Sequence, residues 1–343
     1  MPTVVSFIVS AVVGILPVLV LLAVLQFLDS FKLVRLRVIL WTIGAGAITG
    51  LLAYQVNGFI LSVAEMEFST YSRYIAPVVE EILKASIVLF LFKTHRAGFL
   101  VDAAILGFSV GAGFAVIENI YYLFNSDANL GVWIVRGFGT AVMHGGVTAI
   151  FAIVTMAAME KEEALKPMTV IPGLLVAVVI HSAFNHFFFS PVMSSFAVFV
   201  LLPPFMMLVF ARSNQTLTSW LELDFDADAD LIAQLNSRDF SETHVGQYLN
   251  NLSQHFEGLV IVDILCYLRL YTELSMRAKG AMMMRQHGLE MPNDPAVAAN
   301  FEEMRSLEIN MGKTALLAIA PFLQINRRDL WHLNALESDL DKA

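Results

Sequence analysis

The stretch APVVEEILKA, residues 76–85, places Glu80, Glu81 and Lys84 inside a run that is otherwise apolar enough for lipid. A charged side chain at the centre of a bilayer costs roughly 2.5–3.5 kcal/mol on insertion scales, so three in one span are expensive. Such side chains normally face the interior of a helix bundle, where they pair or line a polar cavity. The stretch therefore predicts a membrane-embedded helical bundle with a polar interior.

The composition divides the chain into a membrane part and a soluble part. Of its 343 residues, 57% are hydrophobic, against about 45–50% in an ordinary soluble domain. The long apolar runs all lie in residues 1–212, whereas residues 213–343 carry 10 Lys and Arg against 19 Asp and Glu. We expect a transmembrane domain over 1–212 and a small acidic helical domain over 213–343. The acidic balance argues against nucleic acid as a partner.

Seven apolar runs are long enough to cross a bilayer as helices. They are residues 3–28, 38–63, 74–92, 98–124, 131–158, 168–190 and 194–211. Lysine and arginine concentrate in alternate connections, so the positive-inside rule predicts an outer N-terminus and a cytoplasmic tail. The predicted fold is an all-α polytopic bundle in the inner (plasma) membrane, with about seven spans and a small cytoplasmic helical domain.

Smaller features complete the expected fold. Glycine pairs four residues apart, Gly46 with Gly50 and Gly107 with Gly111, predict close helix contacts in lipid. The single cysteine, Cys266, excludes an intrachain disulfide and is expected to be buried. The acidic stretch 224–230 lacks the glycine and glutamate of a calcium loop, so it is expected to be a solvated linker. Helical patterns follow near 228–236, 242–286 and 297–320; such a tail would take a regulatory partner or form a homo-oligomer.

Polar residues inside the predicted spans gather on four successive helices. Residues four apart share a helix face, so Glu80 can pair with Lys84, and His181 lies on the same face as Asn185. At about 1.5 Å per residue, these acids and imidazoles fall in the outer half or the centre of the bilayer. They are Glu80, Glu81 and Lys84 in the third run, Glu118 in the fourth, Arg136 and His144 in the fifth, and His181 and Asn185 in the sixth. A polar cavity that opens outward is the simplest way to solvate them.

The order of these residues resembles the PrsW family of intramembrane proteases, which is related to the type II CAAX prenyl endopeptidases. The resemblance rests on EExxK at Glu80–Lys84, FxxxE ending at Glu118, the Arg136 and His144 pair, and HxxxN at His181–Asn185. It covers residues 70–190. The CAAX-type relatives have histidine where this chain has Glu118. The resemblance implies hydrolysis of a peptide bond in a membrane-protein substrate, such as an anti-sigma factor, on the extracytoplasmic side.

Two chemistries are compatible with these residues. In the first, which needs no cofactor, a buried glutamate activates water: Glu80 or Glu81, beside Glu118. His144, His181 and Asn185 would donate to the developing oxyanion, Lys84 would hold one glutamate ionised, and Arg136 is structural or holds a glutamate. In the second, Glu80, Glu118, His144 and His181 hold a divalent metal such as zinc, although the sequence has no HExxH motif. The metal-free version is modestly preferred.

Two functions of other classes remain open from the sequence. A proton-coupled transporter also uses buried acids, lysines and histidines, but the inner halves of the central spans are largely apolar. A noncatalytic scaffold has the same fold without chemistry. The presence of both glutamates in the third run favours an enzyme.

Overall fold

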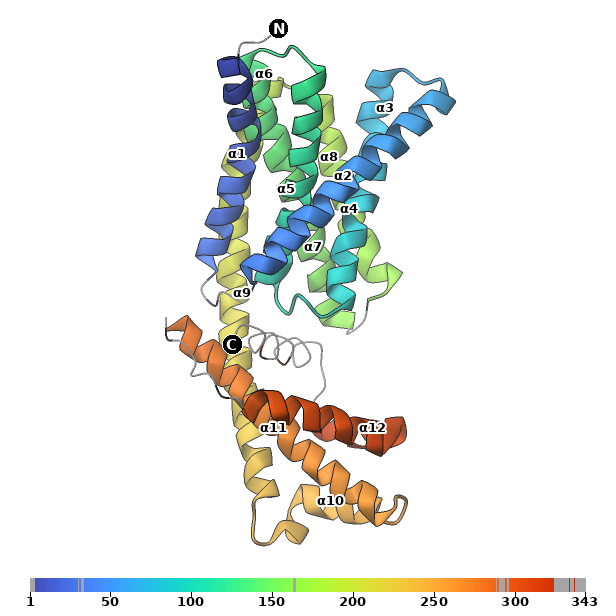
Figure 1. Cartoon of the computed structure of the whole chain (residues 1–343), viewed down its shortest axis with the longest axis vertical. Coiled ribbons are helices and arrows are strands. Elements are labelled where there is room, and N and C mark those ends of the chain that lie inside the picture. The colour runs from blue at the N-terminus through green and yellow to red at the C-terminus, as the bar shows by residue number, and fades with distance from the viewer. Residues whose placement is uncertain are drawn as a thin grey trace. The chain divides into compact units, whose positions relative to one another are not determined.

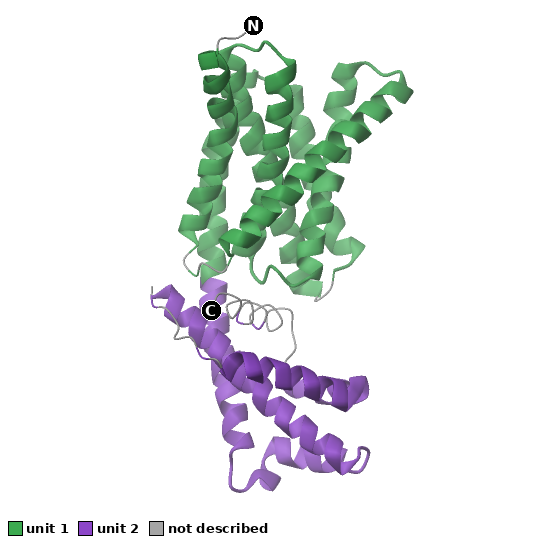
Figure 2. Ribbon diagram, in the orientation of Figure 1, with its two compact units in different colours: residues 1–214 green, residues 215–343 purple. Residues whose placement is uncertain are grey.

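The computed structural model describes residues 4–29, 31, 34–162, 165–287, 289, 294, 296–323, 333 and 336. Within this part of the chain the secondary structure is helical, with no β-strand. Two compact units are present, residues 1–214 and 215–343 (Figure 2). The predicted all-α fold is confirmed.

The membrane unit is a bundle of long helices joined by shorter ones (Figure 1). In chain order they are α1 (Val4–Leu28), α2 (Leu36–Ala64), α3 (Phe68–Tyr74), α4 (Ala76–Lys93), α5 (Leu100–Asn125), α6 (Leu130–Ile134), the π-helix η1 (Val135–Ala141), α7 (Val142–Glu162), α8 (Pro167–His186) and α9 (Pro191–Leu235). The second unit contains the end of α9, the 3₁₀ turn η2 (Phe240–Glu242), α10 (His244–Leu252), α11 (Gly258–Gln286) and α12 (Ala296–Leu323).

Among the described residues, six helical stretches are long and apolar enough to cross a bilayer. They are α1, α2, α5, the continuous stretch Leu130–Glu162, α8 and α9. The seventh expected span is α4, whose 18 residues reach about 27 Å at 1.5 Å per residue. Helix α4 is not among the six apolar stretches because of its charged residues. The prediction of a polytopic helical membrane bundle is therefore confirmed.

Helix α5 forms the centre of the membrane unit. Every residue from Val101 to Ala115 is buried, and the helix packs between α2 and α7 (Figure 1). The approach to α7 is so close that a Cβ on Gly111 would lie 2.2 Å from the carbonyl oxygen of His144. Only glycine permits that approach, which brings the His144 turn of α7 against α5. The predicted glycine contacts are confirmed here and at Gly46, which meets the α5 backbone.

Two expectations about the tail are wrong. The acidic stretch 224–230 is not a linker, because it continues α9 as helix. Its Asp224 and Asp228 carboxylates lie 2.7 and 2.6 Å from the ammonium of Lys279, a side chain only 1% exposed. A buried lysine needs such partners, which explains the acids. Cys266 is exposed on α11 rather than buried.

Candidate active site

The three charged residues of α4 separate into a pair and a single residue. Lys84 Nζ lies 2.5 Å from Glu81 Oε1, and both side chains are at most 1% exposed. The four-residue spacing allowed Lys84 to pair with Glu80, but the ion pair in the structure joins Lys84 to Glu81, three residues away. Burial explains why these two charges form a close ion pair, since either charge alone would be costly in an apolar bundle. Glu81 and Lys84 therefore compensate each other.

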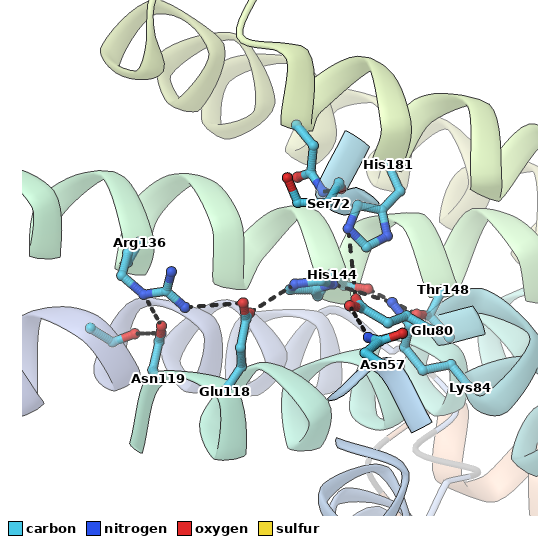
Figure 3. A network of polar contacts seen from close by, with 12 residues as sticks. Asn57, Ser72, Glu80, Lys84, Glu118, Asn119, Arg136, His144, Thr148 and His181 are labelled. Carbon is cyan, nitrogen blue, oxygen red and sulfur yellow. Dashed lines mark hydrogen bonds and ion pairs between the residues drawn. The ribbon is translucent and has the colours of Figure 1, made fainter. Parts of the chain in front are cut away.

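Glu80 points away from that pair, with its side chain 15% exposed. Adjacent helical residues are about 100° apart around the axis, so the two glutamates face different neighbours. The amide nitrogen of Asn57, on α2, donates to Glu80 Oε1 at 3.1 Å. The other carboxylate oxygen, Oε2, lies 3.8 Å from His181 Nε2 (Figure 3).

His181, on α8, connects the two glutamates. Its Nδ1 lies 2.7 Å from Glu81 Oε1. Because the ionised carboxylate of Glu81 only accepts hydrogen bonds, Nδ1 must carry the proton and donate. The other ring nitrogen, Nε2, faces Glu80. Glu81 thus orients His181 as well as compensating Lys84.

His144, on α7, lies at the junction with a second set of charges (Figure 3). Lys84 Nζ lies 3.2 Å from its Nδ1, and Glu118 Oε2 of α5 lies 3.0 Å from its Nε2. An ammonium only donates, so Nδ1 accepts and Nε2 donates to Glu118. The other oxygen of Glu118 lies 3.2 Å from the Arg136 guanidinium. One carboxylate therefore bridges an arginine and a histidine.

The π-helix η1 explains how Arg136 and His144 reach the same carboxylate. Eight residues separate them, which on an ideal α-helix turns their directions apart by about 80°. A π-helical turn closes its hydrogen bonds one residue later and absorbs one extra residue, which reduces the offset to about 20°. Arg136 Nε also donates to Asn119 Oδ1 at 2.8 Å, and Asn119 donates to the Gly14 carbonyl of α1 at 2.7 Å.

Asn185 is the predicted site residue whose hydrogen bond leads away from the cluster. Its amide nitrogen donates to the Ser72 carbonyl of α3 at 2.9 Å. That bond is to backbone, and it holds a neighbouring helix. The sequence reasoning also missed two residues of the network, Asn57 and Tyr71. A signal for Asn57 exists, since an amide inside an apolar span is itself unusual.

The donor set fits a divalent metal. Glu80, His144 and His181 each offer one ligand atom, and these atoms lie within 4.8 Å of one another. Two histidines and one glutamate, with water in the fourth position, are a common catalytic zinc set. Each imidazole also contacts a carboxylate, Glu81 for His181 and Glu118 for His144, as metal-binding histidines commonly do. Glu118, expected as a fourth ligand, lies outside the triad.

Buried acids and imidazoles inside a membrane-spanning bundle define the class of polytopic membrane proteins with an internal polar site. A family model described as "PrsW family intramembrane metalloprotease" matches residues 34–211, more than half of the chain. The chain therefore belongs to the PrsW family of intramembrane proteases. No curated protein and no solved structure matches it. The matched range includes every residue of the site from Asn57 to Asn185.

Proposed function

We propose that the chain is an endopeptidase that cleaves a membrane protein near the extracytoplasmic side, with Glu80, His144 and His181 as its catalytic centre. The observation that carries the proposal is the convergence of these three side chains, from three helices, beside a buried and compensated Glu81–Lys84 pair. A centre of this kind lies at membrane depth, so it suits substrates that are themselves anchored in the bilayer. An anti-sigma factor is one such substrate.

The metal-dependent version has the stronger geometric support. Glu80, His144 and His181 would hold the ion, which would polarise the scissile carbonyl and activate a water molecule. Glu81 fixes the tautomer of His181 through the 2.7 Å contact at Nδ1. Glu118 fixes the ring plane of His144 and is itself held by Arg136. These carboxylates therefore orient the imidazoles without belonging to the triad.

A metal-free version is favoured by one contact. Lys84 Nζ lies 3.2 Å from His144 Nδ1, so a cation already occupies the region of that nitrogen. In this version Glu80 takes a proton from water as the water oxygen bonds to the carbonyl carbon. Glu80 then returns the proton to the leaving amine as the peptide bond breaks.

We further propose the placement that the charge pattern predicts, with the N-terminus outside and the tail in the cytoplasm of the inner (plasma) membrane. Residues 1–212 would form the protease domain and residues 213–343 a separate cytoplasmic domain. The tail would serve as a docking surface for a regulatory partner or a second copy of the chain. Its acidic composition suits a basic protein surface better than nucleic acid or anionic lipid.

Comparative proteomics of membrane fractions tests the peptidase function and finds the substrate. Cells with the wild-type chain are compared with cells carrying Glu80→Gln, which keeps the shape of the side chain but not its charge. We expect at least one membrane protein to appear as a shortened form in wild-type cells and at full length in the variant. Identical fragment patterns, with both chains present in the membrane at equal amounts, would contradict the proposal.

A further inference from the structure

A chain of two hydrogen bonds reaches Glu80 from the short helix α3. Tyr71 is 2% exposed, and its hydroxyl donates to Asn57 Oδ1 at 2.8 Å. Asn57 Nδ2 in turn donates to Glu80 Oε1 at 3.1 Å (Figure 3). The amide of Asn57 has one donor side and one acceptor side, and its NH₂ side is the one that donates to Glu80. The amide oxygen must then face the hydroxyl of Tyr71.

Helix α3 is held in place by α8. Asn185 donates to the Ser72 carbonyl at 2.9 Å, and Ser182 Oγ donates to the Arg73 carbonyl at 2.6 Å. A helix of seven residues is too short to be stable alone, so its position depends on such anchors. The anchored carbonyls directly follow Tyr71 in the chain. Helix α8 therefore carries His181 and also fixes the helix from which Tyr71 reaches toward Glu80.

The two oxygens of Glu80 have different neighbours. Asn57 holds Oε1, while Oε2 lies 3.8 Å from His181 Nε2 on the side of the triad. A carboxylate held at one oxygen loses most of its rotation about the last side-chain bond. The hydrogen bond from Asn57 thus keeps Oε2 directed at His181, which is the orientation that either version of the chemistry needs.

We propose that Tyr71 and Asn57 are positioning residues that orient the catalytic carboxylate of Glu80, and that Asn185 acts by anchoring α3 rather than by touching substrate. This inference rests on the proposed peptidase function. It reassigns Asn185, which the sequence pattern had placed among the oxyanion donors. It also adds α2 and α3, two elements without a catalytic side chain, to the machinery that sets the rate.

The two hydrogen bonds that lead from Tyr71 through Asn57 to Glu80 are called the relay below. Kinetics of the purified full chain in proteoliposomes test it, with the membrane protein identified by the proteomic comparison as substrate. Asn57→Ala is expected to lower kcat about 10- to 100-fold with KM unchanged, the usual cost of removing a group that orients a catalytic side chain. Tyr71→Phe is expected to lower kcat by a smaller factor. Tyr74→Phe is the matched control, because it removes one hydroxyl from the same helix at a 57% exposed position. It should leave kcat unchanged.

Two further comparisons distinguish orientation from general support of the fold. Because Tyr71 acts through Asn57, the double variant Tyr71→Phe/Asn57→Ala should be no slower than Asn57→Ala alone. Asn57→Asp is isosteric but turns an acceptor toward Glu80, so its kcat should fall at least as far as that of Asn57→Ala. A merely structural asparagine would tolerate this isostere. The melting temperatures of all variants are measured alongside to count only folded enzyme.

Three results would overturn the relay: wild-type kcat in Asn57→Ala, multiplicative losses in the double variant, or an effect confined to KM. Its failure is distinguishable from that of the proposed function. If Glu80→Gln is inactive while Asn57→Ala and Tyr71→Phe retain full kcat, only the relay is wrong. If Glu80→Gln is itself fully active, the proposed catalytic centre is wrong, and the relay falls with it.

Discussion

Replacing Lys84 with methionine is expected to lower the free energy of unfolding of the membrane unit by about 3–5 kcal/mol, the usual cost of breaking a buried ion pair from one side. Methionine keeps most of the length and apolar volume of lysine but removes its charge. The Glu81 carboxylate, 1% exposed, then lies in an apolar bundle without the ammonium that was 2.5 Å away. Unfolding of the purified chain, followed by denaturant or heat in detergent, measures the loss.

Two control variants make the Lys84 experiment specific. Lys166→Met removes a lysine whose 3.8 Å contact with Glu162 is more than half exposed, so it should change stability by no more than about 1 kcal/mol. The double variant Glu81→Gln/Lys84→Met removes both buried charges and should recover much of the lost stability. If Lys84→Met unfolds like the wild type, the buried pair contributes little, and the separation of roles between Glu81 and Glu80 loses its basis.

In the metal-dependent version of the proposed function, treatment with a chelator is expected to abolish cleavage and addition of zinc to restore it. Lewis-acid activation supplies several kcal/mol of transition-state stabilisation, and each 1.36 kcal/mol is tenfold in rate, so we expect a loss of at least about 100-fold. The purified chain is dialysed against a chelator and assayed before and after zinc is returned. Metal content is measured on the same samples.

The metal experiment also decides between the two versions of the chemistry. If Glu80 is a ligand, the wild type is expected to bind one zinc ion per chain, and Glu80→Gln is expected to lose it. The exposed pair variant Lys166→Met, which is far from Glu80 in the chain and outside the triad, should retain its zinc. Undiminished cleavage by metal-free protein would instead establish Glu80 as a general base without a metal.

The fold was predictable from the sequence because lipid imposes simple requirements. An apolar run of about 20 residues must close its hydrogen bonds within itself, so helices and their approximate limits follow directly. The interruption of the fifth span by the π-helix η1 was not predictable, since the apolar pattern carries no signal for an extra residue in one turn. The helical continuation of α9 through residues 224–230 was missed because its acids suggest a solvated segment. Their partner, Lys279, is distant in the sequence and is brought beside them only by the fold.

The candidate site was predictable as a set of residues but not as a set of contacts. Helical spacing allowed Lys84 to pair with either glutamate. In the structure it pairs with Glu81, the carboxylate that His181 also approaches from α8. That approach depends on how two helices cross, which spacing within one helix does not encode. The same limit explains Asn185, whose partner Ser72 lies 113 residues away on α3.

Glu118 shows how a departure from the related enzymes is accommodated. At this position the CAAX-type enzymes that the sequence resembles have histidine, which left the partner of the first EExxK glutamate open; the residue here is Glu118. In the structure its two oxygens contact His144 and Arg136, so the carboxylate is matched by a cation and an imidazole. The centre of the Tyr122 ring lies 3.7 Å from Cζ of the same guanidinium. This cation–π contact also holds Arg136 in place.

The rate of substrate cleavage by purified Glu80→Gln in proteoliposomes tests the central claim most directly. If Glu80 lies at the catalytic centre, the rate falls by about 100- to 10,000-fold, as expected for loss of a positioned acid–base or ligand carboxylate. The melting temperature stays at the wild-type value, because Glu80 is partly exposed and the Glu81–Lys84 pair is untouched. A cleavage rate equal to that of the wild type would contradict the assignment of Glu80 to the centre.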